Sequence, residues 1–181
     1  PSGREELADA VARKLAAIEP LPRDHEEALL CGFSNTDWAG SINDLIDEHL
    51  KVEGAEDVTA RYRSGPRLVE MHGQTYLRPT LISCADPGHP LANTEFMFPF
   101  ASVSEVPQER MLNEIGETLV VSAWTENPGW IRQLMNSPDI ERLNIGPFPT
   151  NRVQWEQPHE GNLFEFLYRR RAIQGDLATV S

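Results

Sequence analysis

One carboxylate stands out among the side chains that could do chemistry. Glu95 begins an aromatic and apolar run that continues to Phe100. A carboxylate in such surroundings is costly to bury unless its charge is paired, whereas it costs little at the solvent end of a strand. The pattern therefore makes Glu95 stand out as a candidate functional residue and leaves an ordinary loop carboxylate as the alternative.

A second polar segment, residues 157–162, lies between Trp155 and a helix expected over residues 162–172. Its sequence, Gln-Pro-His-Glu-Gly-Asn, is rich in loop-forming residues. The same residues are typical of a helix N-terminus, where Glu160 and Asn162 would cap the first turn. We favour the capping interpretation and assign no site to this segment.

Several common active-site patterns do not occur in the sequence. It contains neither of the glycine-rich phosphate-binding motifs, G-x-G-x-x-G and G-x-x-x-x-G-K-[ST], and no G-x-S-x-G nucleophile turn. Its histidines have no metal-ligand spacing and no paired cysteines, so no metal site is predicted. These histidines are His25, His49, His72, His89 and His159.

The two cysteines are predicted to be structural. Cys31 and Cys84 lie far apart in the sequence and do not make a disulfide framework. Cys31 would need a neighbouring base and an anion hole to act as a nucleophile, but its neighbours are apolar. We therefore expect both cysteines to be reduced, partly buried small side chains.

Two helices are predicted in the first part of the chain. The first begins at a capping-box pattern, Ser2-Gly3-Arg4-Glu5, carries apolar residues at helical spacing, and ends before Pro20. The second begins near Asp37, has an acidic outer face, and ends before Gly54.

The rest of the chain alternates short strands and helices. Strands are predicted over residues 58–62, 68–71, 76–82, 98–103, 119–124 and 143–145, with a turn at 72–74. Helices are predicted after Pro107, ending at Gly116, and after Asn127-Pro128, with Ile131, Leu134 and Met135 facing inward. Residues 119–124 are nearly continuously apolar, as in a strand covered on both faces, whereas Pro79 favours a sheet edge for 76–82.

This alternation predicts an α/β fold, with a largely parallel sheet and flanking helices. We expect a single domain over residues 1–173, followed by a frayed tail over residues 174–181. The polar residues between these elements are expected to form loops, the longest over 146–161.

Length, composition and charge narrow the class of protein. The chain has 181 residues, 40% of them hydrophobic, which is enough for one core. Its 16 basic and 28 acidic residues give a net charge of −12, which disfavours nucleic acids and anionic membranes as partners. With no apolar run near the roughly 20 residues of a membrane span and no signal segment, a cytoplasmic protein is expected. Because Pro1 replaces an initiator Met, we expect the chain to be cut from a longer one.

Taken in order, several segments resemble the C-terminal part of the catalytic domain of aldehyde dehydrogenases. Residues 76–82, Tyr-Leu-Arg-Pro-Thr-Leu-Ile, resemble the family's G-Y-[FY]-x-x-P-T-[LV]-[LIF] strand. Residues 95–99, Glu-Phe-Met-Phe-Pro, resemble its E-x-F-G-P motif, and residues 118–125 and 140–145 resemble two strands that follow it. The resemblance covers about residues 4–173.

The resemblance implies an NAD(P)-dependent oxidoreductase that oxidises an aldehyde to a carboxylic acid through a thiohemiacetal on a cysteine. It implies that Glu95 binds the nicotinamide ribose, since an ionised carboxylate can accept hydrogen bonds from both ribose hydroxyls. The catalytic cysteine, the cofactor domain and the general-base glutamate would lie upstream of Pro1. No catalytic residue is therefore assigned in this chain, no cofactor is expected to bind it alone, and self-association into a homo-oligomer is expected.

Departures from the family pattern leave the function open. The family's Phe falls on Met97 and its Gly on Phe98, where a ring would crowd the approach of a cofactor. The loop 146–161 also departs from the family's P-F-G-G-x-K-x-S-G pattern. The chain is thus expected to be an aldehyde dehydrogenase-like fragment that is inactive alone, or a non-catalytic module of this type for assembly or partner binding. An unrelated acidic α/β domain is the third possibility.

Overall fold

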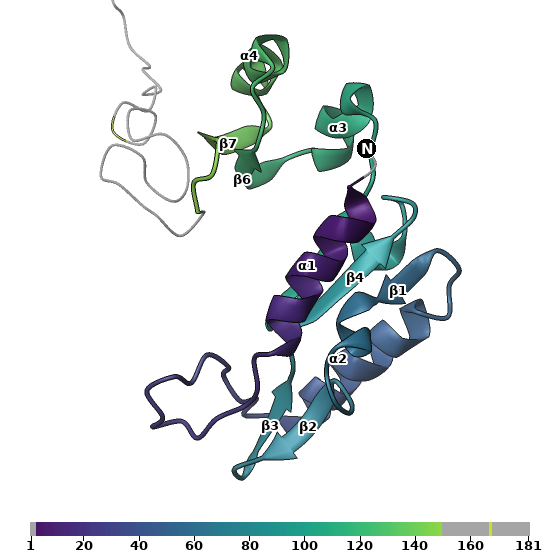
Figure 1. The fold of residues 1–181 in the computed structure, drawn as a ribbon, viewed down its shortest axis with the longest axis vertical. Helices are drawn as coiled ribbons and strands as arrows, with labels where there is room; N and C mark the ends of the chain where they lie inside the picture. Colours follow the sequence, from purple (N-terminus) through teal and green to yellow (C-terminus); the bar gives the residue numbers. More distant parts are fainter. Residues whose placement is uncertain (1–2, 150–166, 168–181) are drawn as a thin grey trace, which may run out of the picture. The chain divides into compact units, whose positions relative to one another are not determined.

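The computed structural model describes residues 3–149 and Leu167, and its chain divides into two compact units, 1–106 and 107–181 (Figure 1). Sequence analysis placed no boundary there, and whether the two units together form one domain stays a prediction. The polar segment 157–162, the rest of the helix expected over 162–172 and the tail 174–181 lie outside the described residues. Each unit is described by itself.

The first unit combines two helices, a three-stranded sheet and a hairpin. The helices are α1 (Arg4–Ala16) and α2 (Thr36–His49), and two short 3₁₀ helices are η1 (Val58–Arg61) and η2 (Pro90–Ala92). The sheet has the order β1 (Ala55–Asp57), β4 (Thr80–Cys84), β5 (Phe100–Ser104). The hairpin consists of β2 (Leu68–Met71) and β3 (Gln74–Leu77).

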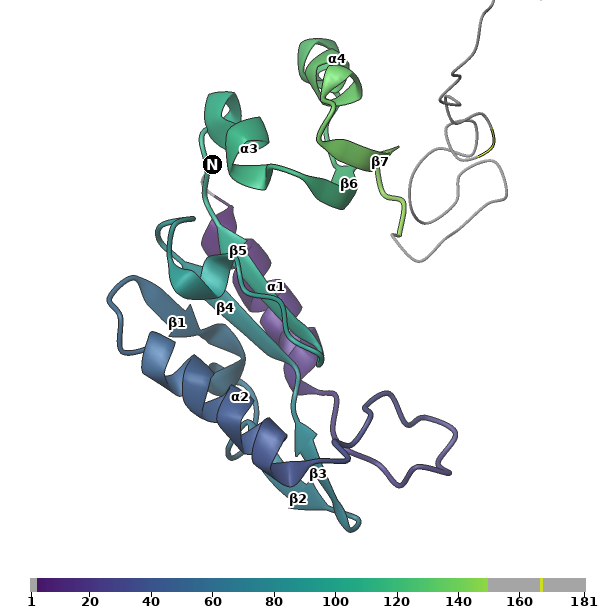
Figure 2. The ribbon, with the colours of Figure 1, turned by 180° about the vertical axis from the view of Figure 1, so that it is seen from behind.

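Strand β4 is the centre of the first unit and is covered on both faces. Leu81 packs with Ala12 of α1, whereas Ile82 and Cys84 pack with Ile46 of α2. Successive side chains of a strand point to opposite faces, so one strand serves both helices. Figures 1 and 2 show α1 and α2 on opposite sides of this strand. The first unit is therefore built as helix, sheet and helix in three layers.

The position of β4 corrects the prediction of an edge strand. The segment 76–82 is two strands, with Pro79 between them. Strand β4 pairs antiparallel with β1 and parallel with β5, so it has neighbours on both sides. Pro79 lies just before the first paired residue, Thr80, where its missing N–H removes no hydrogen bond from the ladder.

The strand predicted over residues 58–62 is also wrong. The strand there is β1, which ends at Asp57, and the chain then turns into η1. The Asp57 carboxylate accepts a hydrogen bond from the backbone N–H of Ala60 at 3.1 Å, so it caps this short helix. A capping acid favours the turn over the extended conformation that the alternation of Val58–Tyr62 suggests.

The two helices and the hairpin are confirmed. The N-cap of α1 is Gly3, with no side-chain cap, and Ser2 of the predicted capping box lies outside the described residues. Asn35 caps α2 and accepts a hydrogen bond from the Trp38 N–H at 3.1 Å. The hairpin turn has φ of 53° at His72 and 72° at Gly73, the left-handed pair typical of tight two-residue hairpins.

In its described residues, the second unit is a strand–helix–strand arrangement with one preceding helix. Its elements are α3 (Gln108–Ile115), β6 (Thr118–Ala123), α4 (Pro128–Asn136) and β7 (Ile140–Ile145). Strands β6 and β7 are parallel, with Thr118 opposite Ile140, and α4 makes the crossover. The predicted helix end at Gly116 is confirmed, with a φ of 59°, and so is the Asn127 cap, which accepts from two backbone N–H groups of α4.

Two predictions in the second unit are wrong. No residue of β6 is fully buried among the described residues, so this strand is not covered on both faces. On α4, Leu134 is buried as predicted, but Met135 is 68% exposed and Trp130 takes the second inward position. Trp130 and Leu134 are four residues apart and share the inward face, whereas Met135, one residue after Leu134, is turned by about 100° around the helix.

The sheets are mixed, which corrects the prediction of a largely parallel sheet within an α/β fold. In the described residues, two strand pairs are parallel (β4–β5 and β6–β7) and two are antiparallel (β1–β4 and β2–β3). The two-residue turn between β2 and β3 can join only antiparallel strands. None of the described helices has the length and apolar character needed to cross a membrane.

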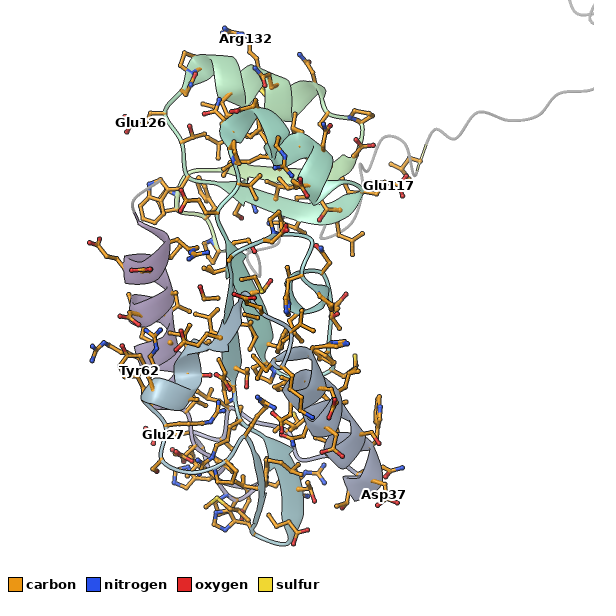
Figure 3. The ribbon with its side chains drawn as sticks, turned by 90° about the vertical axis from the view of Figure 1, so that its right-hand side faces the viewer. Glu27, Asp37, Tyr62, Glu117, Glu126 and Arg132 are labelled. Carbon is orange, nitrogen blue, oxygen red and sulfur yellow. The ribbon has the colours of Figure 1, made fainter. Side chains whose placement is uncertain are left out.

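Many charged side chains lie on the outside of each unit. Figure 3 shows Glu27 and Asp37 on the first unit, and Glu117, Glu126 and Arg132 on the second, pointing away from the ribbon; all are exposed. The same figure labels Tyr62, which is half-buried with the Arg13 guanidinium 4.4 Å from its ring centre. The acidic surplus of the sequence is therefore a property of the surface.

Candidate cofactor-binding site

Glu95 lies in the loop between η2 and β5, and its side chain is exposed. It forms no hydrogen bond or ion pair with another described residue. This position in a loop before a strand agrees with the alternative that Glu95 is an ordinary loop carboxylate. The open carboxylate also leaves its oxygens available to a ligand, which is what a binding residue requires.

The segment 95–100 alternates between solvent and core. Glu95, Met97 and Pro99 are exposed, and Met97 reaches 79%. The three phenylalanines between them, Phe96, Phe98 and Phe100, are half-buried and pack against the core beside α2. Their ring centres lie 4.8 to 5.9 Å apart. Glu95 and Met97 are therefore exposed on a segment that aromatic contacts anchor to the core.

The packing of Phe98 bears on the predicted crowding of the site. Its ring lies 5.9 Å from that of Phe96 and 5.8 Å from that of Phe100, on the core side of the segment. Glu95 and Met97 are exposed, whereas Phe98 is half-buried. The ring at the family's glycine position is thus used for packing against the core.

The backbone around Glu95 is held by short local hydrogen bonds. The Asn93 amide donates to the Pro87 carbonyl at 2.6 Å, and the Thr94 hydroxyl donates to the Pro90 carbonyl at 2.6 Å. The Ser102 hydroxyl of β5 donates to the Ala92 carbonyl at 2.9 Å. These bonds tie the loop to itself and to the sheet, so the backbone position of Glu95 is defined although its side chain forms no hydrogen bond or ion pair with a described residue.

A second carboxylate, Asp57, lies in the opposite environment. It is buried at the end of β1, where Arg63 donates to it at 2.6 Å and Arg67 at 3.2 Å, and the Thr59 hydroxyl also donates to it. Burial alone would raise the pKa of Asp57, but the Thr59 hydrogen bond and the two guanidinium charges outweigh it and hold the pKa below its ordinary value. The oxygens of this carboxylate are bonded to side chains of the protein, so Asp57 is not a candidate ligand site.

Sequence analysis missed this arginine cluster. Arg67 also pairs with Asp47 of α2 at 3.0 Å, and Arg78 pairs with Glu19 at 2.8 Å. The only signal was the density of arginines between Arg61 and Arg78 in an otherwise acidic chain. Such a density does not distinguish a surface patch from a buried network.

The cysteines occupy different environments. Cys84 is fully buried, and its burial raises the pKa of its thiol. Cys31 is exposed, so its predicted partial burial is wrong; it lines a cavity of about 340 Å³ together with Arg23, Gln74 and Tyr76. No histidine or carboxylate lines that cavity among the described residues, so Cys31 has no base there to activate it.

No group of three or more histidine, cysteine or carboxylate side chains gathers as a metal site in the part of the chain that the structure describes. Among the described residues, Glu95 therefore remains the candidate site residue. It lies on a loop that the fold holds in place. Its oxygens suit hydroxyl donors, such as those of a sugar, better than they suit anions.

No protein-family model and no curated protein matches the sequence. Solved structures that share its fold include aldehyde dehydrogenases, of which this chain matches a part. An indole-3-acetaldehyde dehydrogenase in complex with NAD+ superposes with a TM-score of 0.70 at 16% identity, over 90% of this chain and 32% of its own. An aldehyde dehydrogenase from Bacillus cereus gives 0.65 at 16% identity, over 82% of this chain and 30% of its own.

A succinic semialdehyde dehydrogenase from Streptococcus pyogenes, in complex with NADP+, gives a TM-score of 0.61 at 16% identity, over 82% of this chain and 32% of its own. The chain thus spans about a third of the length of the aldehyde dehydrogenases it matches. At this level of identity the likeness establishes the fold, and it confirms the resemblance to part of an aldehyde dehydrogenase that the sequence motifs indicate.

Proposed function

We propose that this chain forms the C-terminal part of the catalytic domain of an NAD(P)-dependent aldehyde dehydrogenase-like oxidoreductase. The observation that carries the proposal is the superposition of most of this chain on aldehyde dehydrogenases, two of them in complex with NAD+ or NADP+. The complete protein would oxidise an aldehyde to a carboxylic acid. The nucleophilic cysteine and the glycine-rich cofactor loop would come from other segments, because the sequence of this chain contains no candidate for either.

The role of Glu95 in this proposal is to hold the nicotinamide ribose. Its carboxylate has no partner among the described residues, so no internal contact must break before a ligand binds. The Phe98 ring packs against the core, and the loop is held by hydrogen bonds from the Thr94 and Ser102 hydroxyls to backbone carbonyls. When bound, the dinucleotide supplies the hydride acceptor of the oxidation. Glu95 itself would orient the sugar and transfer no proton.

The test is the affinity for reduced cofactor of the full-length protein that contains this chain. Glu95→Gln keeps the shape of the side chain and removes its charge, so we expect the dissociation constants of NADH and NADPH to rise about 10- to 100-fold. Fluorescence titration measures both. Glu26→Gln, an exposed acid far along the chain from Glu95, is the matched control and should leave both constants unchanged. Equal affinities in the two variants would contradict the role of Glu95.

The 181-residue chain by itself is expected to be inactive. It supplies one ribose contact and no nucleophile, and catalysis of this kind requires both to be held together. The measurement is aldehyde-dependent formation of NADH or NADPH, with the intact mass of the chain verified. Turnover above the rate without protein would contradict this expectation.

A non-catalytic module is the second candidate. Met97 and Phe98 stand where the family has Phe and Gly, and these substitutions favour it. In that case the full-length protein would bind neither NADH nor NADPH, and Glu95→Gln would change nothing. An aldehyde substrate, self-association and a cytoplasmic location remain predictions from the resemblance.

A further inference from the structure

His89 is a buried polar side chain next to the candidate site. It is 5% exposed and serves as the N-cap of η2, where its Nδ1 accepts a hydrogen bond from the Leu91 N–H at 3.1 Å. The Cys84 thiol of β4 lies 4.0 Å from the same nitrogen. The ring is thus lodged between the central strand and the start of the Glu95 loop.

The hydrogen bond to Leu91 fixes the tautomer of His89. Because Nδ1 accepts, it carries no proton, and in the neutral ring the proton lies on Nε2. Nε2 is buried and has no partner among the described residues. A buried donor without a partner reduces stability, and asparagine, aspartate or serine would cap η2 without this cost. Stability alone therefore does not explain a histidine at position 89, which points to a role in positioning the loop.

A short path leads from His89 to Glu95. Leu91 is fully buried in the core beside α2, so its amide is a fixed point. One residue before it, the Pro90 carbonyl accepts the Thr94 hydroxyl, and one residue after it, the Ala92 carbonyl accepts the Ser102 hydroxyl. Thr94 is bonded covalently to Glu95, so the orientation of η2 sets where the carboxylate emerges.

We propose that His89 is a positioning residue for Glu95: by holding the Leu91 amide it orients η2, and η2 holds Thr94 and therefore the carboxylate. This inference rests on the proposed function, in which Glu95 binds the ribose.

The test uses three variants of the full-length protein that contains this chain. His89→Leu fills the site but cannot accept a hydrogen bond, His89→Asn keeps a capping acceptor, and Thr94→Val removes the donor to Pro90 with little change of shape. Hydrogen exchange of the amides of residues 91–96 reports the order of the loop, and titration with NADH and NADPH reports binding. Exchange of β4 and β5 shows whether each variant remains folded.

We expect His89→Leu to speed exchange of the Leu91 amide about tenfold and to weaken cofactor binding severalfold. His89→Asn should restore both to near the unsubstituted values, and Thr94→Val should weaken binding while leaving the Leu91 amide protected. Rescue by asparagine separates capping from simple filling of space.

Three outcomes would overturn the inference. The first is unchanged exchange at Leu91 in a folded His89→Leu protein. The second is faster exchange with unchanged cofactor affinity in His89→Leu and Thr94→Val while Glu95→Gln still weakens binding, which leaves the proposed function standing. The third is unchanged affinity in Glu95→Gln, which overturns the proposed function and this inference together.

Discussion

The first unit contains two carboxylates in opposite surroundings. The Asp57 side chain is 7% exposed and is bonded by Arg63, Arg67 and Thr59, whereas Glu95 is exposed and bonded by no described residue. Both stand beside apolar residues in the sequence. The difference teaches that an acid beside apolar residues can either be paired inside the fold or be left open to solvent. Stability should depend on the first acid and ligand binding on the second.

The largest effect on stability is expected from Asp57→Asn, which changes the buried carboxylate of the two. It removes the charge that compensates Arg63 and Arg67 while both stay buried, so the free energy of unfolding should fall by about 3–5 kcal/mol. Urea unfolding measures it. Glu56→Gln, the neighbouring acid in an exposed pair with Arg61, is the matched control and should have a much smaller effect. Similar losses in the two variants would refute the distinction between buried and exposed pairs.

Lowering the pH should gradually remove the stabilisation that the charged Asp57 side chain provides. The pKa of Asp57 is held below its unfolded value, so its stabilisation is complete above the unfolded pKa, near 3.9, and is lost as the pH falls through the folded pKa. The difference in unfolding free energy between the unsubstituted protein and Asp57→Asn should therefore be constant near neutral pH and shrink below about pH 4. A difference that grows in acid would contradict this sign. Urea titrations at several pH values give the curve.

A smaller effect is expected from the aromatic anchor under Glu95. Phe98→Ala removes a half-buried ring from the cluster with Phe96 and Phe100, so it should cost about 1–3 kcal/mol, less than a fully buried phenylalanine. Met97→Ala is the control, because Met97 is 79% exposed and should change stability little. The same urea assay applies. If Met97 proved the more costly of the two, the assignment of inner and outer faces would be reversed.

The smallest effect on stability is expected from Glu95→Gln. The side chain has no partner among the described residues, so the free energy of unfolding should change by no more than about 0.5 kcal/mol. Thermal or urea unfolding checks this on the same preparations that are used for cofactor titration. A large loss would mean that Glu95 supports the fold, and the contrast with Asp57 would disappear.

Sequence patterns predicted local structure better than pairing. The helices α1, α2 and α4, the hairpin turn at His72-Gly73 and the end of α3 follow from apolar spacing, caps and glycine, all of which act within a few residues. The central place of β4 did not follow, because Pro79 suggests an edge unless the residue lies just outside the ladder. The mixed sheets were missed for a different reason: the partner of a strand can lie far away in the sequence, and local patterns do not identify it.

Glu95 was recognisable because its neighbours are unusual for an acid, and the resemblance gave it a role. Its exposure was left open by the sequence, and the inward turn of Phe98 was not foreseen. Asp57 was overlooked, because its partners Arg63 and Arg67 look like surface residues until the chain folds. His89 was treated as one histidine among five, because its hydrogen bond to Leu91 is visible only in three dimensions.

By itself, the sequence of this protein determined its class of fold, most of its helices and a candidate carboxylate, because these depend on residue types and on spacing along the chain. Only the tertiary structure decided which acid is paired inside the protein and which is left exposed. That decision depends on where Arg63 and Arg67 arrive and on which face of the segment 95–100 meets the core. Burial sets the cost of an unpaired charge, and burial is a property of the packed molecule.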